Sequence, residues 1–142
     1  MIYIGSDHTG YPLKSALADY LKESGIVFTD LGCNGETVDY PDIARLVCAK
    51  VLENNANRGV LVCGTGIGIS MAANKIKGIR AALCGDYYSA KYTRKHNDAN
   101  VICFGKHVTG AGLATELLDV FLNTGFDGGK HIPRVNKIEG EI

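Results

Sequence analysis

The chain has 142 residues and a mass of 15.2 kDa, which is the size of one domain rather than two. Hydrophobic residues make up 46% of the sequence and charged residues 21%, a composition that excludes a disordered chain. Fifteen Lys and Arg residues balance fifteen Asp and Glu residues, so no net charge attracts nucleic acid or an anionic membrane surface. We therefore expect one globular domain over residues 1–142, with no nucleic-acid partner and no membrane partner.

The first residues and the cysteine pattern indicate in which cell compartment the protein is expected. Met1–Gly5 lacks a basic region and leads directly into a strand-like segment, so no signal peptide is expected. The five cysteines form an odd set without a Cys-x-x-Cys pair, and Cys63, Cys84 and Cys103 lie in apolar runs. This pattern favours reduced thiols in a cytoplasmic protein over a disulfide framework or a zinc site.

Five short apolar runs predict the strands of a sheet. Most of them end on a glycine, and they cover residues 2–5, 27–32, 60–64, 81–85 and 101–105. Hydrophobic and polar residues do not alternate within the runs, which is typical of parallel strands covered on both faces.

Helix-like stretches separate these runs. Apolar residues recur every three or four positions within residues 13–21, 39–51 and 113–121, and we expect Gly25 and Gly125 to end the first and the last of these helices. The alternation of strand and helix predicts an α/β fold: a single three-layer α/β/α Rossmann-like domain with a five-stranded parallel sheet.

Polar residues gather where the predicted strands end. In a parallel sheet these carboxyl ends share one edge, and ligands bind there near the switch in strand order. The segments at that edge are Ser6–His8, Cys63–Gly66, Gly85–Tyr87 and Gly105–His107. Because they bring together histidines, aspartates, a cysteine and a glycine loop, we expect a functional site at this edge.

The segment Gly64–Ser70 predicts an anion-binding loop. It follows a strand and opens a helix, so its backbone N–H groups can hold an anion or a developing oxyanion. A tight turn without a ligand is the alternative interpretation. The loop lacks both the Gly-Lys-Ser/Thr ending of a nucleoside-triphosphate loop and the sixth-position glycine of a dinucleotide loop, although Asp86 keeps nicotinamide binding open as a minor alternative.

Cys63 directly precedes this loop. A thiol at the N-terminus of a helix ionises more readily than a free one, so Cys63 is a candidate base or nucleophile. Cys84 and Cys103 are interpreted instead as small buried strand residues.

A set of short motifs runs along the chain in a fixed order. They are Gly5–His8, Asp39–Pro41, Cys63–Gly68, Ala73–Lys75, Gly78–Ala81, His96–Asn100, Gly128–His131 and Arg134–Val135. Together they resemble the family of ribose-5-phosphate isomerase B, which also holds galactose-6-phosphate and allose-6-phosphate isomerases. Each motif alone is weak, but the ordered set is specific and covers essentially the whole chain.

The resemblance implies an aldose–ketose isomerase that acts on a sugar phosphate without a metal or other cofactor. It further implies a homodimer with active sites shared between subunits, and pairing of dimers into tetramers is left open. The C-terminal tail, about residues 126–142, is expected to pack on the partner subunit. Some family members without a cysteine before the glycine loop act on galactose 6-phosphate, so Cys63 favours ribose 5-phosphate as the substrate.

Three residues are the candidate catalytic groups. Isomerisation opens the sugar ring and moves a proton from C2 to C1 through an enediolate, whose charge the loop N–H groups would receive. By the resemblance, Cys63 takes the C2 proton, Thr65 relays a proton or binds the ring oxygen, and His96 opens the ring. A histidine that merely caps the end of a helix is the alternative for His96.

The resemblance also supplies candidate substrate-binding residues. They are Asp7, His8, Tyr40, Gly64, Gly66, Ile67, Gly68, Ser70, Asn97, Asn100, His107, Lys130 and Arg134. Structural alternatives remain for several of them: a helix cap with a solvated neighbour for Asp7 and His8, and a polar turn for Asn97 and Asn100.

The expected phosphate contacts depart from the family pattern. The family often has arginine at the positions of His107 and Lys130, and this chain keeps only Arg134. Lysine is a point charge and histidine is mostly neutral at pH 7, so neither replaces the bidentate arginine fork. The identity of the sugar therefore stays open, with allose 6-phosphate or another hexose 6-phosphate as alternatives, and a phosphosugar-binding module without turnover as the alternative from another class.

Overall fold

The computed structural model describes residues 1–140, in which strands and helices alternate along the chain. The elements are β1 (Ile2–Ser6), α1 (Tyr11–Glu23), β2 (Phe28–Asp30), α2 (Tyr40–Leu52), β3 (Arg58–Cys63), α3 (Ile67–Ala73), β4 (Ala81–Leu83), α4 (Tyr87–Asn97), β5 (Val101–Gly105), α5 (Ala111–Asn123), the 3₁₀ turn η1 (Gly129–His131) and α6 (Ile132–Ile138).

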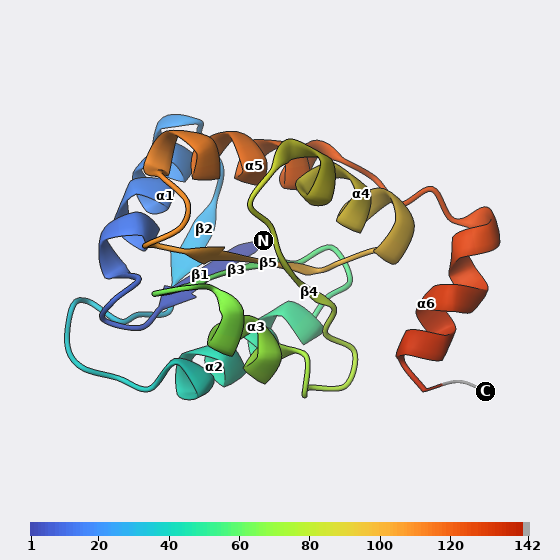
Figure 1. Cartoon of the computed structure of the whole chain (residues 1–142), viewed down its shortest axis with the longest axis horizontal. Coiled ribbons are helices and arrows are strands. Elements are labelled where there is room, and N and C mark those ends of the chain that lie inside the picture. The colour runs from blue at the N-terminus through green and yellow to red at the C-terminus, as the bar shows by residue number, and fades with distance from the viewer. Residues whose placement is uncertain (141–142) are drawn as a thin grey trace.

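The strands form one five-stranded sheet in the order β2-β1-β3-β5-β4, with every pairing parallel. Helices α1, α4 and α5 cover one face, and α2 and α3 cover the other (Figure 1). The three-layer α/β/α architecture predicted from the sequence is confirmed. The strand order reverses beside β1 and β3, so the switch point lies between the loops that follow these two strands.

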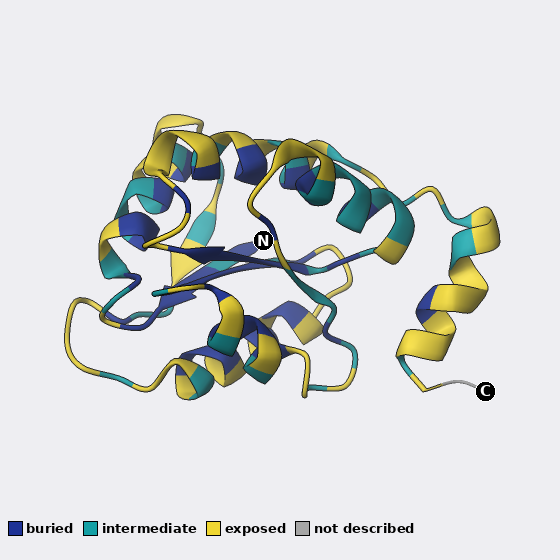
Figure 2. Cartoon of the chain, in the orientation of Figure 1, coloured by how far each residue is buried: buried dark blue, intermediate teal, exposed yellow. Residues whose placement is uncertain are grey.

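The central strands carry the core. β5 is buried along its whole length and β3 is buried from Gly59 to Cys63, as Figure 2 shows in dark blue. The edge strands β2 and β4 have only three residues each, fewer than the runs 27–32 and 81–85 predicted. An edge strand forms hydrogen bonds with a neighbouring strand on one side only. Val27, at the predicted start of β2, lies outside the strand and is 70% exposed.

The predicted end of α1 at Gly25 is confirmed, but the predicted end of α5 at Gly125 is not. Gly25 has a φ of +69° and donates its N–H to the carbonyl of Lys22, which ends α1 as expected. The expectation that Gly125 ends α5 was wrong. The helix stops at Asn123, and Thr124 leaves it with extended backbone while its hydroxyl donates to the Val120 carbonyl at 2.6 Å.

Helix α6 stands apart from the three layers at the right of Figure 1. Its end is tied back by Glu139, which accepts hydrogen bonds from the Arg80 guanidinium at 2.6 Å and from the Gly78 N–H at 3.0 Å. Ile132 and Ile138 are 48% and 60% exposed. The expected packing of the tail on a partner subunit stays a prediction, and residues 141–142 of that tail lie outside the described range. Within residues 1–140, no helix has the length and apolar character to cross a membrane.

Lys14 fastens α1 to the segment that follows β2. Its side chain is 1% exposed, and its ammonium donates to the two carboxylate oxygens of Asp30 at 2.7 and 2.8 Å and to the Cys33 carbonyl at 2.6 Å. These three acceptors compensate the ammonium for the water it loses on burial. The start of the segment leading to α2 is thereby fixed.

Replacing Lys14 with methionine should lower the free energy of unfolding by about 2–3 kcal/mol, because Asp30 and the Cys33 carbonyl lose their shared donor. Urea unfolding followed by circular dichroism measures the change. Lys50→Met is the matched control: Lys50 pairs with Glu53 on an exposed helix surface, and its loss should cost at most about 0.5 kcal/mol. Equal losses in the two variants would contradict the prediction.

Candidate active site

Main-chain hydrogen bonds join the loops that follow β1, β3 and β5 at the carboxyl edge of the sheet. The N–H of Asp7 donates to the Val62 carbonyl at 3.2 Å, and the N–H of His107 donates to the Gly64 carbonyl at 3.0 Å. The imidazole of His107 also covers Gly64, where an added Cβ would lie 3.4 Å from its Cδ2. The predicted meeting of these loops therefore occurs.

Cys63 lies at the base of the glycine loop and is 4% exposed. Its Sγ accepts the N–H of Gly66 at 3.1 Å. Gly66 has a φ of +76°, and an added Cβ would lie 2.5 Å from Leu83 Cδ1 and 2.8 Å from the Phe104 carbonyl carbon. Only glycine fits this position, so the loop is pressed against β4 and β5 with its N–H directed at the sulfur.

Part of the expected oxyanion-binding set is already engaged. Besides the Gly66 N–H, the Ile67 N–H donates to Thr65 Oγ1 at 3.2 Å, and the Ser70 N–H donates to the Gly66 carbonyl at 3.3 Å. The Ser70 hydroxyl donates to the Ile67 carbonyl at 2.8 Å. The N–H groups of Gly66, Ile67 and Ser70 thus have partners within the chain, and the proposed oxyanion contacts fall to the other N–H groups of the loop. Gly68 lies in the first turn of α3, where N–H groups have no partner inside the helix.

Tyr40 and Asp7 complete this edge. An added Cβ on Gly68 would lie 2.7 Å from Tyr40 Cζ, so the glycine makes room for the ring. Asp7 is 7% exposed, and its Oδ1 accepts the N–H of Gly10 at 2.8 Å, which holds the turn before α1. The neighbouring His8 is exposed, and its Nδ1 is 3.5 Å from the Val38 N–H.

We call these groups the cysteine half-site. It contains Asp7, His8, Tyr40, Cys63, Gly64, Thr65, Gly66, Ile67, Gly68, Ser70 and His107.

The remaining candidates lie at the opposite edge. His96 and Asn97 end α4, Asn100 precedes β5, and Lys130 and Arg134 follow in η1 and α6. We call these five residues the histidine half-site. Because β5 has five residues and a strand rises about 3.3 Å per residue, the two edges are roughly 15 Å apart. One chain therefore does not bring all its predicted site residues together.

Asn100 is committed to the fold. Its side-chain oxygen accepts the Arg80 N–H at 2.9 Å, and its amide nitrogen donates to the Gly78 carbonyl at 2.8 Å. These contacts match the polar-turn alternative and leave little of the amide for a sugar hydroxyl. Asn97 differs, because its side chain is exposed and only its carbonyl is used, by Arg80 Nε at 3.0 Å.

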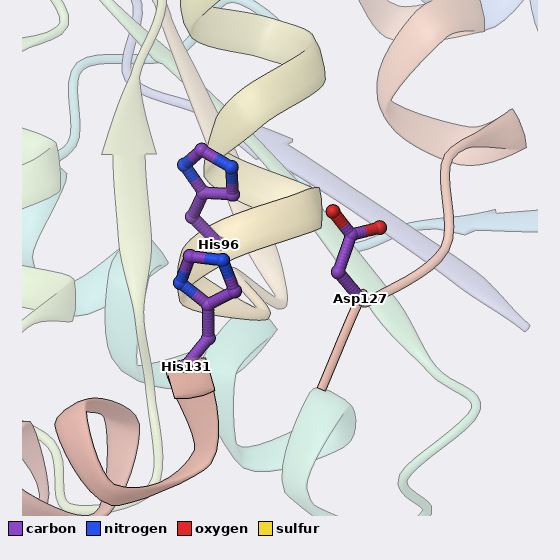
Figure 3. Close-up of side chains that lie close together, drawn as sticks. All are labelled: His96, Asp127 and His131. Carbon is purple, nitrogen blue, oxygen red and sulfur yellow. The ribbon is translucent and has the colours of Figure 1, made fainter. Parts of the chain in front are cut away.

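His96 has neighbours that the sequence analysis did not single out. Its ring stacks on His131 with centroids 4.3 Å apart and an interplanar angle of 14°, and it contacts Tyr92 at 4.9 Å and 58°. Figure 3 shows the two imidazoles one above the other, with Asp127 beside them. The i, i+4 spacing of Tyr92 and His96 was a usable signal, whereas the His131 contact depends on the path of η1.

The structure bears on two sequence interpretations outside these half-sites. Burial raises the pKa of Cys84 to about 12 and that of Cys103 well above its usual range, in keeping with inert buried thiols. Asp86 caps α4, accepting the Ser89 N–H at 2.8 Å and its hydroxyl at 2.7 Å, and these bonds lower its pKa. The carboxylate that kept nicotinamide binding open thus has a structural role.

Iodoacetamide at pH 8 should label Cys63 before Cys48, Cys84 and Cys103. Burial raises the pKa of Cys48 and Cys84 to about 12, so almost no reactive thiolate exists there, while Cys63 Sγ already accepts an N–H bond. A time course of peptide mass spectrometry on the native protein measures the order. Earlier labelling of Cys48 or Cys103 would contradict it.

The comparisons with known proteins agree on one family. A family model described as Ribose/Galactose Isomerase matches residues 2–138. Ribose-5-P isomerase B of Listeria innocua is 48% identical over 97% of this chain and 94% of its own length. D-erythrulose-4-phosphate isomerase of Pectobacterium atrosepticum is 43% identical over 96% of this chain and 91% of its own length.

Solved structures give the same result. A ribose 5-phosphate isomerase from Thermotoga maritima has a TM-score of 0.95 at 46% identity, covering 98% of this chain and 97% of that one. Ribose-5-phosphate isomerase B from Mycoplasma genitalium, solved with bound ribulose-5-phosphate, has a TM-score of 0.92 at 42% identity, covering 98% and 93%. The similarity therefore extends over nearly the whole fold.

Proposed function

This chain belongs to the ribose/galactose isomerase family, and we propose on that basis that it interconverts ribose 5-phosphate and ribulose 5-phosphate. The observation that carries the proposal is the Cys63 sulfur, which accepts the Gly66 N–H at 3.1 Å beneath a glycine loop at the carboxyl edge of the sheet. A thiol base beside N–H donors is what proton transfer through an enediolate requires. The ribulose-5-phosphate bound to the Mycoplasma genitalium relative supports the choice of substrate.

The proposed mechanism assigns a step to each catalytic group. His96 opens the ring by accepting the anomeric hydroxyl proton and protonating the ring oxygen. Cys63 as thiolate takes the proton from C2 and returns it to C1, while Thr65 passes the O2 hydroxyl proton to O1. The Gly68 N–H, in the first turn of α3, stabilises the enediolate charge.

The proposed active site needs two chains. The cysteine and histidine half-sites of one chain lie roughly 15 Å apart, too far to contact one five-carbon substrate with the geometry that catalysis requires. In a two-fold dimer, the cysteine half-site of one subunit faces the histidine half-site of its partner. The exposed Ile132 and Ile138 of α6 give the tail an apolar surface for packing on that partner. Two dimers can then pair into a tetramer.

The phosphate grip is proposed to draw on both half-sites. His107 of one subunit covers the glycine loop of that same subunit. The partner's Lys130 and the partner's Arg134 are exposed and belong to the same half-site as the partner's His96. Asp7, His8, Tyr40 and Asn97 are then left for the sugar hydroxyls and the ring. Five buried unpaired cysteines support a reducing, cytoplasmic location.

Other sugar phosphates are the second candidate substrates. The erythrulose-4-phosphate isomerase at 43% identity shows that relatives this similar include an enzyme for a shorter sugar, and allose 6-phosphate is the six-carbon alternative. A phosphosugar-binding module without turnover is disfavoured, because binding alone needs no thiol at the base of the loop.

Ribose 5-phosphate turnover in EDTA should fall about 10²- to 10⁴-fold in Cys63→Ala, the loss expected for a removed general base. A coupled assay of ribulose 5-phosphate formation measures the rate. Cys84→Ala removes another buried thiol and should keep wild-type turnover. No wild-type turnover on this sugar would shift the proposal to allose 6-phosphate or erythrulose 4-phosphate, and tight binding of all three without turnover would favour the binding module.

Mixed dimers test the shared site. Cys63→Ala and His96→Ala should each be nearly inactive, but after subunits are unfolded and refolded together, activity should return to roughly a quarter of wild type, since half of the dimers are mixed and each holds one intact site. Each variant refolded alone is the control. A mixture that stays inactive, although mixed dimers are detected by native mass spectrometry, would place both residues in one chain's site.

A further inference from the structure

A row of stacked aromatic rings leads to His96. Tyr88 and Tyr92 stack with centroids 4.2 Å apart, Tyr92 contacts His96 at 4.9 Å, and His96 stacks on His131 at 4.3 Å. The first three lie on one side of α4 at i, i+4 spacing, and the fourth comes from η1. The His96 ring therefore contacts a ring of its own helix and a ring of the C-terminal segment, His131, which Figure 3 shows beside it.

The position of His131 is itself fixed by the C-terminal segment. Its N–H donates to the Gly128 carbonyl at 3.0 Å, and η1 leads directly into α6. The far end of that helix is anchored by the ion pair of Glu139 with Arg80 at 2.6 Å. Asp127, just before η1, pairs with the Lys95 ammonium at 3.2 Å. The stack thus rests on contacts at both ends of the segment.

A metal site is the obvious alternative for this cluster, because ligand atoms of His96, Asp127 and His131 lie within 4.8 Å of one another. A metal ion must lie in the plane of each imidazole that binds it, and two rings stacked at 14° share no such position. Lys95 already pairs with Asp127, and further cations flank His131. Geometry and charge both disfavour a cation here.

We propose that His131 is a positioning residue for His96: by stacking on its ring, it holds the imidazole in the orientation that ring opening requires. The inference rests on the proposed function. Two parallel aromatic rings resist rotation of either one, and a catalytic group displaced by about 1 Å loses much of its effect. Tyr92 also contacts the His96 ring, with centroids 4.9 Å apart.

The surroundings of His131 favour its neutral form. Its pKa is lowered by burial first, and then by His96, Lys130 and Arg134, with only Asp127 acting in the opposite direction. Lys95 on α4 neutralises much of that carboxylate. A neutral His131 leaves the protonation changes of ring opening to His96, since two stacked imidazolium rings would repel each other.

Two substitutions separate stacking from other roles of His131. His131→Ala removes the ring, and His131→Phe keeps an aromatic ring that cannot titrate. The alanine variant should lose about fivefold to tenfold in kcat with KM within twofold of wild type, and the phenylalanine variant should recover most of that loss. Asn136→Ala, at an exposed position of α6, is the matched control and should behave as wild type.

Nuclear magnetic resonance on the free protein gives a readout independent of turnover. The imidazole C–H protons of His96 should move downfield in His131→Ala, which loses the ring current of the stacked neighbour, and should stay near their wild-type shifts in His131→Phe. If these shifts behave as expected but the wild type turns over no sugar phosphate, the proposed function fails while the stack stands.

Stability against pH adds a second independent readout. Because folding lowers the His131 pKa, its neutral form stabilises the fold above the ordinary histidine range near pH 6.5, and this contribution is lost as the pH falls through the lower folded-state value. Thermal unfolding at pH 7.5 and 5.5 should therefore show a larger drop in Tm for wild type than for His131→Phe.

Three results would overturn the proposal. An unchanged kcat in His131→Ala would show that His96 needs no stack. Equal losses of kcat in the alanine and phenylalanine variants would show that the His131 imidazole itself contacts the substrate. Unchanged His96 resonances in His131→Ala would show that the rings do not stack in solution.

Discussion

The parallel sheet imposes the main constraint on this protein. Every strand ends at the same edge, so the loops after β1, β3 and β5 gather around Cys63, while the end of α4 and the segment before β5 are carried to the opposite edge. The length of a buried strand then separates Cys63 from His96. The proposed mechanism uses both residues, and this separation is the reason why we propose a site shared between two copies of the fold.

Close packing around glycines determines the shape of the cysteine half-site. Gly66 has no room for a Cβ against Leu83 and the Phe104 backbone, and Gly68 leaves room for the ring of Tyr40. Both positions lie between rigid neighbours, so the N–H directed at the Cys63 sulfur is held by the core and not by the loop alone. The Cys63 sulfur is therefore held in place by the buried strands β3 and β5.

Local patterns were enough to predict the fold and the position of the glycine loop after Cys63, whereas Tyr40 became a candidate only through the family resemblance. The apolar runs identified all five strands, and the contiguous loop from Gly64 to Gly68 identified the carboxyl-edge site. The histidine half-site depends on contacts between distant segments, which no local pattern records. The side chain of Asn100 is engaged by Arg80 and Gly78, and the ring of His131 reaches His96 because the chain brings η1 beside the end of α4. The cap formed by Asp86 was within reach of the sequence, since an aspartate three residues before a serine at a helix start is a common capping arrangement.

The brevity of the outer strands has a consequence for behaviour at high concentration. An open sheet exposes unpaired N–H and C=O groups along its two outer strands, where another chain can add a strand and begin aggregation. Here β2 and β4 offer only three residues each, and β2 ends on the charged Asp30. A strand of that length provides too few main-chain hydrogen bonds to hold an incoming chain. The fold can therefore expose apolar residues such as Ile132 and Ile138 on α6 without also presenting long strand edges as a template for fibre growth.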